Sequence, residues 1–385
     1  MPITIEKADS PAQMKAFIDF PYALHKGTPW VPYVRQDTEK MLSKTKNPFF
    51  QHSDADFFLA RRDGAVVGRI CAIENREHNR FHNEHIGFFG WWEVVDDVEV
   101  TRALIAAAEA WCRERKLTAM RGPASYSSND EFGLLVEGND APPVFLNPWH
   151  PKYYGAHLEA LGYAKAKDLL GFTRPQSLPL NETIVKLAER VKKHHPNLSV
   201  RTIDMSRLAE EVELIRGLYN AAWENNWGFV PMTAAEFDAI VETLRQIVIP
   251  EMVVFVEGPR ADDPTKKEVA GWLMTLPDIN PVFVKMGGSL FPFGWATFLW
   301  EKWRSHGFRD MKVHRLITLG IVPKWRNKGV DALLYERSWR NSMECGFESC
   351  DFSWVLEDNE RMLAALIKSG GAVLYKRFRI YEKPL

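Results

Sequence analysis

The residues with the clearest chemistry form the segment LGIVPKWRNKG, from Leu319 to Gly329. An apolar run ends at Pro323, a basic loop carrying Arg326 follows, and the loop opens into DALLYERSWRNSM, which has a helical pattern. The first N–H groups of a helix have no partner within the helix, and the helix dipole favours negative charge at that end. The segment therefore predicts a strand, a loop and a helix that together bind the pyrophosphate of a nucleotide-type cofactor.

The loop resembles the acyl-CoA loop of the GCN5-related N-acetyltransferases, the GNAT superfamily, whose pattern is Gln/Arg-x-x-Gly-x-Gly/Ala. Arg326 and Gly329 match this pattern. Asp331 stands where the family has Gly or Ala, and Ala332 comes one place late. A carboxylate at this position would repel the phosphates if it pointed inward.

The order of elements after the loop also resembles this superfamily. A strand-like run covers Glu348–Trp354, Asn359 can cap a helix that ends at a Gly-Gly pair, and an aromatic strand covers Val373–Tyr381. In the family an Asn at the start of this late helix contacts the CoA arm, although Asn359 equally fits an ordinary helix cap. Many members also carry a tyrosine on this helix that protonates the departing thiolate, and Leu366 stands at that position here.

The resemblance implies an acyl-CoA co-substrate, with acetyl-CoA as the first expectation, whose acyl group passes to an amine that attacks the thioester directly. Backbone N–H groups at the end of the strand would polarise the thioester carbonyl, and the loop would hold the pyrophosphate. The residues implied to bind the co-substrate are Leu319, Gly320, Ile321, Val322, Arg326, Asn327, Lys328, Gly329, Val330 and Asn359.

Two tyrosines and one glutamate are candidates for the proton transfers. Tyr375 and Tyr381 lie on the predicted last strand, where their even spacing places them on one face, and either phenol can replace the missing acid. Both also fit half-buried strand aromatics with no chemical role. Glu224, in WENNWGFVP, lies where the family builds its acceptor pocket and can accept the amine proton. A solvated Glu224 in an aromatic packing loop is the alternative.

Candidate contacts to the amine acceptor lie in two loops. The loop SYSSNDE carries Asn129, Asp130 and Glu131 after a predicted strand, where amide and carboxyl groups can orient an amine. A turn that satisfies its own backbone is the alternative. Trp227 is the aromatic candidate from WENNWGFVP. We expect Asn129, Glu131 and Trp227 to bind the acceptor.

The two halves of the chain repeat one order of elements, and this is the order of GNAT domains. We expect an α/β (α+β) protein with two tandem GNAT-like domains, each a mixed, mostly antiparallel sheet flanked by helices. The predicted division is residues 1–173, a linker and connecting helix over 174–195, and residues 196–385. The first half has the acidic stretch Glu93–Glu99 where the second half has its basic loop, so we expect the first half to bind no CoA.

Composition argues against several other classes of protein. The 385 residues have a formal net charge of −1, so no broad field attracts nucleic acid or an anionic membrane. No run reaches the roughly 18 apolar residues of a membrane span, no secretory signal opens the chain, and the four cysteines form no Cys-x-x-Cys pair, so we expect a cytoplasmic protein. The histidines His78, His82 and His85 are better explained by a solvated loop than by a metal site, so no metal is expected.

The function predicted from these features is acyl-CoA-dependent N-acyl transfer, most simply acetyl transfer from acetyl-CoA to a small-molecule or peptide amine, by a monomer or homodimer. Two alternatives remain. Tandem GNAT copies also occur in enzymes that transfer long acyl chains, or aminoacyl groups from tRNA, and the near-zero net charge argues against a tRNA donor. A non-catalytic sensor of acyl-CoA or another metabolite is the second alternative, because Asp331 and Leu366 depart from the family pattern.

Overall fold

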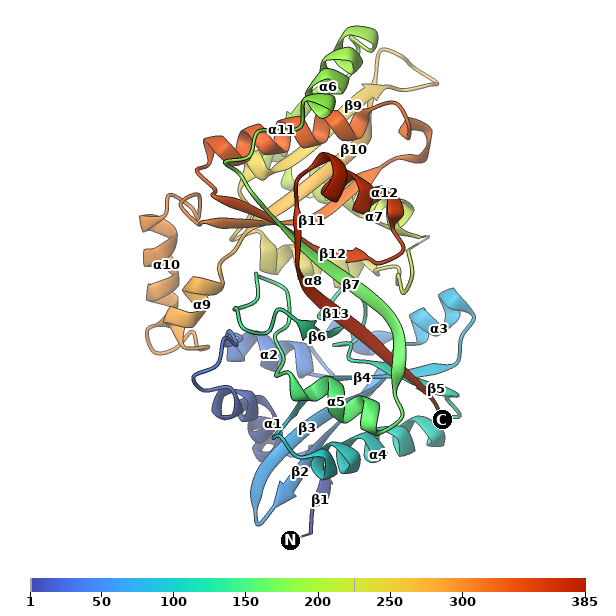
Figure 1. The fold of residues 1–385 in the computed structure, drawn as a ribbon, viewed down its shortest axis with the longest axis vertical. Coiled ribbons are helices and arrows are strands. Elements are labelled where there is room, and N and C mark those ends of the chain that lie inside the picture. The colour runs from blue at the N-terminus through green and yellow to red at the C-terminus, as the bar shows by residue number, and fades with distance from the viewer. Residues whose placement is uncertain (1, 225) are drawn as a thin grey trace.

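The computed structural model describes residues 2–224 and 226–385, and its elements fall into two successive sets joined by helix α6 (Glu182–His194) (Figure 1). The first set is β1 (Thr4–Lys7), α1 (Pro11–Leu24), α2 (Arg35–Leu42), β2 (Asp54–Arg62), β3 (Ala65–Glu74), α3 (Arg76–His82), β4 (Ile86–Val94), α4 (Val98–Glu114), β5 (Ala119–Gly122), β6 (Leu134–Glu137), α5 (Tyr153–Ala160) and β7 (Ala164–Pro175). The second set is β8 (Ser199–Thr202), α7 (Leu208–Trp223), α8 (Ala234–Leu244), β9 (Val253–Pro259), β10 (Lys267–Pro277), α9 (Asn280–Met286), α10 (Gly294–Arg304), β11 (Val313–Ile321), α11 (Val330–Glu344), β12 (Ser349–Leu356), α12 (Glu360–Ala364) and β13 (Val373–Pro384).

All thirteen strands of the described chain join one sheet. Their order is β1-β2-β3-β4-β5-β13-β7-β12-β11-β10-β9-β8, and β6 pairs with β13 outside this path. The pairs β4–β5 and β11–β12 are parallel, and the other pairs are antiparallel. The predicted α/β fold, with tandem halves of mixed, mostly antiparallel strands flanked by helices, is confirmed.

The two halves share one sheet because each gives a strand to the other. The C-terminal strand β13 ends beside β5 of the first half, with Tyr381 opposite Gly122. Strand β7 of the first half ends beside β12 of the second, with Pro175 opposite Ser349. β7 and β13 also pair with each other and cross the middle of the molecule as two long strands (Figure 1). Residue 173, the predicted end of the first domain, therefore lies in a strand that pairs with the second half.

Side-chain alternation along the strands separates a core on each face of the sheet. On β3, Cys71 and Ile73 face a core shared with α1, whereas Ile70 and Ala72 face a core shared with α4. Successive strand residues point to opposite faces, so one strand can serve both cores. The second half repeats the arrangement, with α6 and α11 on one face of β9 and β10 and α7 and α8 on the other.

Phe378 of β13 tests how strongly the exchanged strand stabilises the fold. It is fully buried in the core that α1, β2 and β7 share. We expect Phe378→Ala to lower the free energy of unfolding by about 3–5 kcal/mol, because the cavity left behind cannot fully collapse. Val373→Ala, at a 62% exposed position of the same strand, should cost less than about 0.5 kcal/mol. Urea unfolding followed by circular dichroism measures both, and equal losses would contradict the assignment.

Helices form in three regions where none was predicted, and the first of them is α2, in a passage through Phe50 that was expected to be irregular. The histidine-rich segment is helix α3, so the prediction of a solvated loop is wrong: Asn75 caps the helix by accepting a hydrogen bond from the His78 N–H, and His78 is buried with its ring 4.4 Å from that of His82. Helices α9 and α10 lie between β10 and β11, where Gly, Pro and aromatic residues interrupt any helical pattern. Side-chain capping and packing stabilise α3. A Gly-Gly turn ends α9 and separates it from α10.

Candidate active site

The sheet opens between β11 and β12 in the second half. The two strands pair in parallel only as far as Arg315 and Asp351, although β11 continues to Ile321 and β12 to Leu356. On its other edge β12 stays paired with β7 from Ser349 to Leu356. Within the described chain, the facing strand edges therefore have no strand partner across the gap. An extended ligand with amide groups can pair with such an edge as an added strand.

A β-bulge in β11 lies beside this opening. Thr318 lies opposite Met274 of β10, and Leu316 lies opposite Thr275, so Ile317 is the extra residue. A bulge turns the backbone and redirects its polar groups. The hydroxyl of Thr318 is buried and has no hydrogen-bond partner among the described residues, and Thr318 lines the space between the strands. This part of β11 can therefore direct polar groups at a ligand.

The opening leads into a cavity of about 880 Å³ whose wall comes from both halves of the chain. The second half contributes residues 315–321 and 352–356, and the first half contributes 30–34 and 125–131. Large apolar side chains form much of the wall, among them Trp30, Phe49, Trp91, Phe145, Trp149, Trp223, Trp227, Phe229, Met232, Trp272, Met274, Phe283 and Trp354. A cavity of this size and character accommodates a ligand with a long apolar part.

The loop between β11 and α11 reaches one end of the cavity through Arg326 and carries uncapped backbone N–H groups and a second cation beside it. Asn327 and Gly329 have positive φ angles of 62° and 76°, and Gly329 is the N-cap of α11 without a side-chain capping bond. The first N–H groups of α11 therefore remain available to an anion. Arg326 lines the cavity, and the Lys328 ammonium lies 4.6 Å from the centre of the Trp325 ring. These groups fit a pyrophosphate.

Asp331 is accompanied by a cation. Its Oδ2 lies 3.8 Å from Nη2 of Arg361, and both residues line the cavity. The guanidinium offsets the repulsion that a carboxylate would exert on a phosphate. The departure from the family pattern at Asp331 is therefore compatible with an anionic ligand at this helix.

The late helix α12 supplies a cap but no acid. Asn359 accepts a hydrogen bond from the N–H of Met362 at 3.2 Å, as a helix cap does, and it also lines the cavity. Leu366 is buried in the core between β7 and β12. Tyr335 of α11 lines the cavity instead, with its hydroxyl 3.7 Å from the sulfur of Met362. Burial raises the pKa of Tyr335 to about 12, so this phenol carries its proton at neutral pH.

The first half contains the same opening, but its own chain fills it. Strands β4 and β5 pair only as far as Phe88 and Arg121, although β4 continues beside β3 to Val94. Ala124 enters the gap and donates its N–H to the carbonyl oxygen of Phe89 at 2.8 Å. A side chain at Gly90 would come within 1.9 Å of the Ala124 carbonyl oxygen, so only glycine permits this approach. Protein backbone thus occupies the space that is open in the second half.

The helix that follows the first opening also differs from α11. Asp97 caps α4 by accepting a hydrogen bond from the N–H of Glu99 at 2.9 Å, and it pairs with Arg62 at 2.7 Å. A carboxylate therefore caps the start of α4, whereas the start of α11 has no side-chain cap. Both features agree with the expectation that the first half binds no CoA, which remains a prediction.

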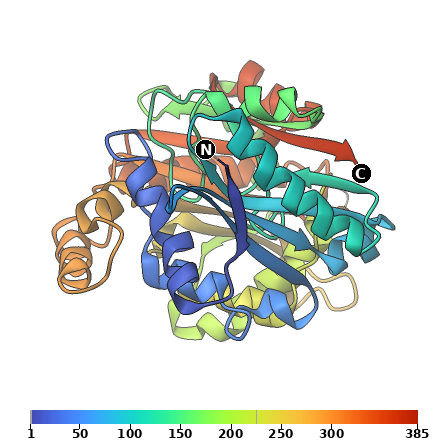
Figure 2. The same ribbon diagram turned by 90° about the horizontal axis from the view of Figure 1, so that it is seen from below.

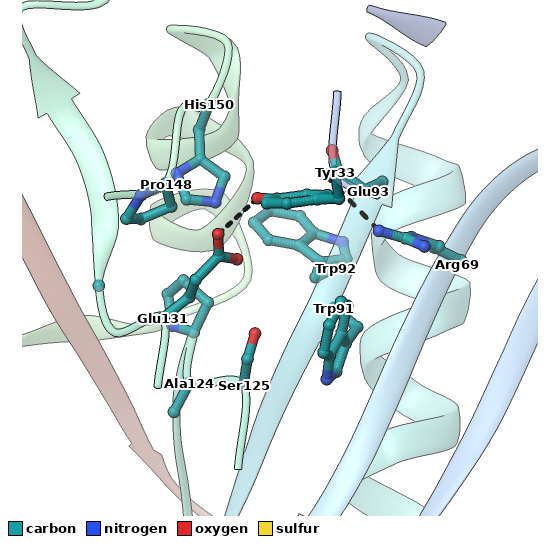
Figure 3. A pocket seen from close by; sticks show the side chains of 12 residues that line it. Tyr33, Arg69, Trp91, Trp92, Glu93, Ala124, Ser125, Glu131, Pro148 and His150 are labelled. Atoms are coloured by element: carbon teal, nitrogen blue, oxygen red, sulfur yellow. Dashed lines mark hydrogen bonds and ion pairs between the residues drawn. The ribbon is translucent and has the colours of Figure 1, made fainter. Parts of the chain in front are cut away.

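Two carboxyl groups line the first-half end of the cavity, Asp130 and Glu131. Glu131 accepts a hydrogen bond from the Tyr33 hydroxyl at 2.6 Å (Figure 3), and Asp130 accepts one from the Ser127 hydroxyl at 3.0 Å. Among the described residues, no Lys, Arg or His forms an ion pair with either carboxyl. Burial raises the pKa of each to about 7. Groups with such pKa values can bind an ammonium and take its proton near neutral pH.

A third buried carboxyl group, Glu93, lies behind this end of the cavity and is already paired (Figure 3). His25 lies 2.7 Å from its carboxylate, Tyr154 donates to it at 2.8 Å, and Arg69 lies at 3.9 Å. Burial acts to raise the pKa of Glu93, but His25 and Arg69 together lower it to about 2. Glu93 therefore stays ionised and hydrogen-bonded, whereas Glu131 can gain or lose a proton near neutral pH.

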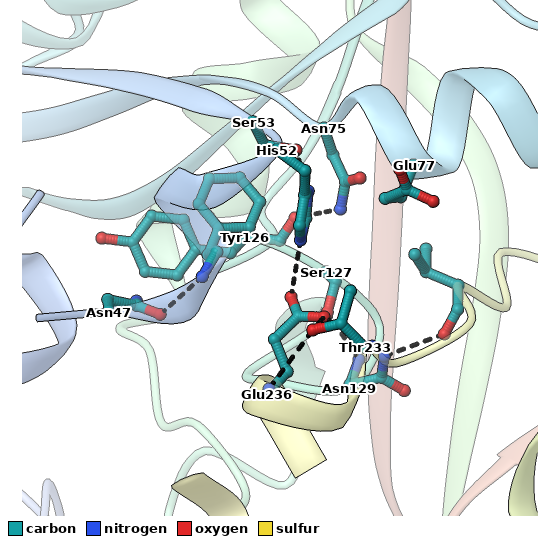
Figure 4. A network of polar contacts seen from close by, with 12 residues as sticks. Asn47, His52, Ser53, Asn75, Glu77, Tyr126, Ser127, Asn129, Thr233 and Glu236 are labelled. Atoms are coloured by element: carbon teal, nitrogen blue, oxygen red, sulfur yellow. Dashed lines mark hydrogen bonds and ion pairs between the residues drawn. The ribbon is translucent and has the colours of Figure 1, made fainter. Parts of the chain in front are cut away.

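Polar contacts across the cavity join the two halves. Asn129 accepts a hydrogen bond from the Tyr219 hydroxyl at 2.8 Å and donates one to the carbonyl oxygen of Val230 at 3.0 Å. His52 and Glu236 approach each other at 3.1 Å from opposite halves (Figure 4). The two Asn129 bonds tie the loop that carries the carboxyl groups to α7 and to Val230, and the His52 contact ties the first half to α8.

The structure brings many of the predicted site residues to one cavity. Those that line it are Asn129, Glu131, Trp227, Leu319, Gly320, Ile321, Arg326 and Asn359. Val322, Asn327, Lys328 and Gly329 belong to the strand end and loop beyond the wall, and Val330 is fully buried.

The three predicted catalytic residues lie elsewhere. Tyr375 donates to Asp351, and Tyr381 donates to Glu159 at 2.9 Å, and in the described chain neither tyrosine lines the cavity. Glu224 is exposed at the end of α7. Tyr335 was not among the predicted site residues, although it follows Asp331 by four residues and so lies on the same face of the helix.

The part of the chain that the structure describes holds neither a metal-binding cluster nor a membrane-spanning helix. No group of three or more His, Cys, Asp or Glu side chains is placed to share a metal ion. No helix is both long and apolar enough to cross a bilayer. The polar side chains that line the cavity carry carboxyl, hydroxyl, phenol, guanidinium, ammonium and amide groups.

Two relatives match the chain over nearly its whole length. A bacterial ceramide synthase of Caulobacter vibrioides is 34% identical over 391 residues, which covers 100% of this chain and 98% of that protein. Protein YghO of Escherichia coli is 34% identical over 375 residues, which covers 97% of this chain and 93% of that protein. No protein-family model matches the chain.

A solved structure shares the fold. A tandem GNAT protein from the clavulanic acid biosynthesis pathway superposes with a TM-score of 0.54 over 100% of this chain and 98% of that one, at 13% identity. The resemblance first indicated by Arg326 and Gly329 is thus confirmed. The chain has the tandem GNAT fold, and it belongs to the family that contains the bacterial ceramide synthase of Caulobacter vibrioides and protein YghO of Escherichia coli.

Proposed function

We propose that the chain transfers an acyl group from acyl-CoA to the amine of a long-chain amino alcohol. The observation that carries this proposal is the largely apolar cavity of about 880 Å³ between the β11–β12 opening and the carboxyl groups of Asp130 and Glu131. An acetyl group and a small amine leave most of the wall uncovered, whereas alkyl chains gain roughly 25 cal/mol for each Å² of apolar surface removed from water. The name of the ceramide synthase relative supports the same chemistry, because a ceramide is an N-acylated long-chain amino alcohol.

The second half holds the acyl donor in this proposal. CoA, when bound, supplies an activated thioester. The uncapped N–H groups at the start of α11 and the guanidinium of Arg326 hold the pyrophosphate, since Arg326 and Asp331, on either side of the helix start, line the cavity. The free edge of β11 pairs with the amide-containing arm and polarises the thioester carbonyl. The residues assigned to the donor are Leu319, Gly320, Ile321, Val322, Arg326, Asn327, Lys328, Gly329, Val330 and Asn359.

Proton transfer is assigned to cavity groups from both halves. Glu131, with Asp130 beside it, takes the proton of the acceptor ammonium, because its pKa of about 7 lets it accept a proton at neutral pH. Tyr335 of α11 gives a proton to the departing thiolate, in the place of the absent tyrosine at Leu366. No proton transfer is assigned to Tyr375, Tyr381 or Glu224, because none of them is among the described residues that line the cavity.

A panel of donors and acceptors tests the proposal. We expect thiol release with palmitoyl-CoA and a long-chain amino alcohol such as sphinganine, and little with acetyl-CoA or with a short amine such as ethanolamine. The released CoA is measured with a thiol reagent and the amide product by mass spectrometry. Equal turnover of acetyl-CoA and palmitoyl-CoA would overturn the long-chain assignment, and binding without turnover of any donor would favour a sensor.

Narrowing the cavity should change the preferred chain length. Ala239 of α8 lines the cavity, and Ala239→Trp fills part of it. We expect this variant to lose kcat/KM for palmitoyl-CoA by about tenfold or more, since overpacking or lost burial costs 1–3 kcal/mol, while lauroyl-CoA is affected less. Asp238→Trp, at the exposed neighbouring position, is the matched control and should keep the original preference. An unchanged preference in Ala239→Trp would place the alkyl chains elsewhere.

A further inference from the structure

Helices α9 and α10 form a pair that projects from the side of the molecule (Figure 1, Figure 2). One face of α10 packs inward: Phe298 lies against Phe308 with ring centres 5.4 Å apart, and Glu301 is buried. The connection between the two helices is tied to the first half, where the backbone N–H of Arg35 donates to the carbonyl oxygen of Gly288 at 3.1 Å. The pair is therefore held firmly on its inner side.

The outer side is aromatic and uncovered. Six large apolar side chains of α10 and the preceding connection are between 49% and 74% exposed: Phe291, Phe293, Trp295, Leu299, Trp300 and Trp303. The last four recur at helical spacing and so share one face of α10. Scattered exposed apolar residues are ordinary, but a contiguous group of this kind marks an interaction surface.

The charges around these side chains are mostly positive. Helices α9 and α10 carry three cations, Lys285, Lys302 and Arg304, and one carboxylate, Glu301. Glu301 is buried and bonded to Lys285 at 2.8 Å and to Arg304 at 2.7 Å, so it offers no exposed negative charge. The two helices therefore carry a local surplus of two positive charges. The net charge of −1 for the whole chain does not reveal this surplus, and for that reason no membrane contact was expected from the sequence. Aromatic side chains beside Lys and Arg suit the headgroup region of an anionic bilayer.

The surface is continuous with the cavity wall through α9. Asn280 and Phe283 line the cavity, while Val284 and Lys285, one step further along the helix, are exposed. A lipid surface in contact with α9 and α10 would therefore meet the protein beside the apolar cavity.

We propose that α9, α10 and residues 287–293 form a docking surface for an anionic lipid membrane. Trp300, Trp303 and the neighbouring aromatic side chains enter the headgroup region, and the three cations contact lipid phosphates. The proposal rests on the composition, exposure and charge of this surface and does not depend on the proposed reaction, because it concerns binding to vesicles without substrate.

Vesicle co-sedimentation of the full chain tests this proposal. We expect binding to vesicles of equal parts phosphatidylglycerol and phosphatidylcholine, and weaker binding to phosphatidylcholine alone or in about 0.5 M salt. Trp300→Ser/Trp303→Ser should weaken the binding by about tenfold or more, because interfacial affinity scales with buried apolar area. Met343→Ser/Val373→Ser removes two exposed apolar side chains elsewhere and should bind as the unchanged chain does.

Folding and oligomeric state are measured on the same samples. Each variant should keep the thermal unfolding temperature of the unchanged chain, and Phe291→Ser/Phe293→Ser provides a second test of the surface should the tryptophan variant unfold. An unchanged chain that does not sediment with the phosphatidylglycerol vesicles would overturn the proposal. A dimer by light scattering that the tryptophan variant converts to a monomer, without vesicle binding, would assign the surface to a second copy of this chain instead.

Discussion

Glu131→Gln is expected to lower kcat for amine acylation by about 10²–10⁴-fold, the usual contribution of a general base. Glutamine keeps the size of the side chain and can still accept a hydrogen bond from Tyr33, but it cannot take a proton. The loss should appear in kcat with both long and shorter acyl donors, since it concerns the amine. Glu137→Gln, at a surface position paired with Arg377, is the control and should leave kcat unchanged.

The pH profile identifies the group that titrates. Burial raises the pKa of Glu131 to about 7, and only the ionised form is a base, so the rate should fall about tenfold per pH unit below pH 7 and reach a plateau above it. The hydrogen bond from Tyr33 lowers this pKa, so Tyr33→Phe should move the falling limb to higher pH. A limb that persists in Glu131→Gln and disappears in Asp130→Asn would assign the base to Asp130, whose pKa is also about 7.

Glu131→Gln is expected to stabilise the folded chain above neutral pH although it lowers the catalytic rate. The pKa of Glu131 is raised in the folded chain from an ordinary value of 4.5 to about 7, so ionisation at higher pH opposes folding. This destabilisation is absent below about pH 4.5 and complete above about pH 7. Glu131→Gln should therefore unfold at a higher temperature than the unchanged chain at pH 8 and at the same temperature at pH 4.5. A less stable variant at pH 8 would mean that lost activity reflects lost structure.

The strand, loop and helix around Arg326 were predictable because their determinants are local. Pro323 ends the apolar run, Gly329 supplies a positive φ angle, and the amphipathic pattern marks the helix. The structure confirms this order, with β11 ending at Ile321 and α11 beginning at Val330. The short α9 and α10 escaped prediction because their propensities are weak and tertiary packing decides them.

The pairing of the long strands could not be predicted in the same way. Alternation identifies β7 and β13 as strands but does not name their partners, which lie far along the chain. The sheet that joins the two halves follows from that exchange. The cavity is equally non-local, because its acceptor end combines Glu131 with Tyr33, from a Pro-containing passage that has no periodic signal, and with Tyr219 beyond it.

Gly329→Val is expected to weaken the binding of CoA by about 100-fold or more. Gly329 has a φ angle of 76°, a conformation that costs a side-chain-bearing residue about 1–3 kcal/mol and a β-branched residue more. An added Cβ would also lie 2.4 Å from Cγ2 of Val191 on α6, so the loop or α6 must move. Each 1.4 kcal/mol corresponds to about a tenfold change in affinity, so the two effects together exceed two powers of ten. Calorimetric titration with CoA measures the loss.

A glycine at the other end of α11 provides the control that separates a local effect on the pyrophosphate loop from general backbone strain. Gly346 follows α11 with a φ angle of 81° and has no atom within 4 Å of an added Cβ, so Gly346→Val carries similar backbone strain far from the pyrophosphate loop. We expect Gly346→Val to lose stability but to bind CoA normally. Gly329→Ala should bind weakly, and Val191→Ala should restore part of its affinity by removing the contact while leaving the positive φ angle. If Gly329→Val and Gly346→Val bind CoA equally well, the pyrophosphate lies elsewhere and the assignment of the loop fails.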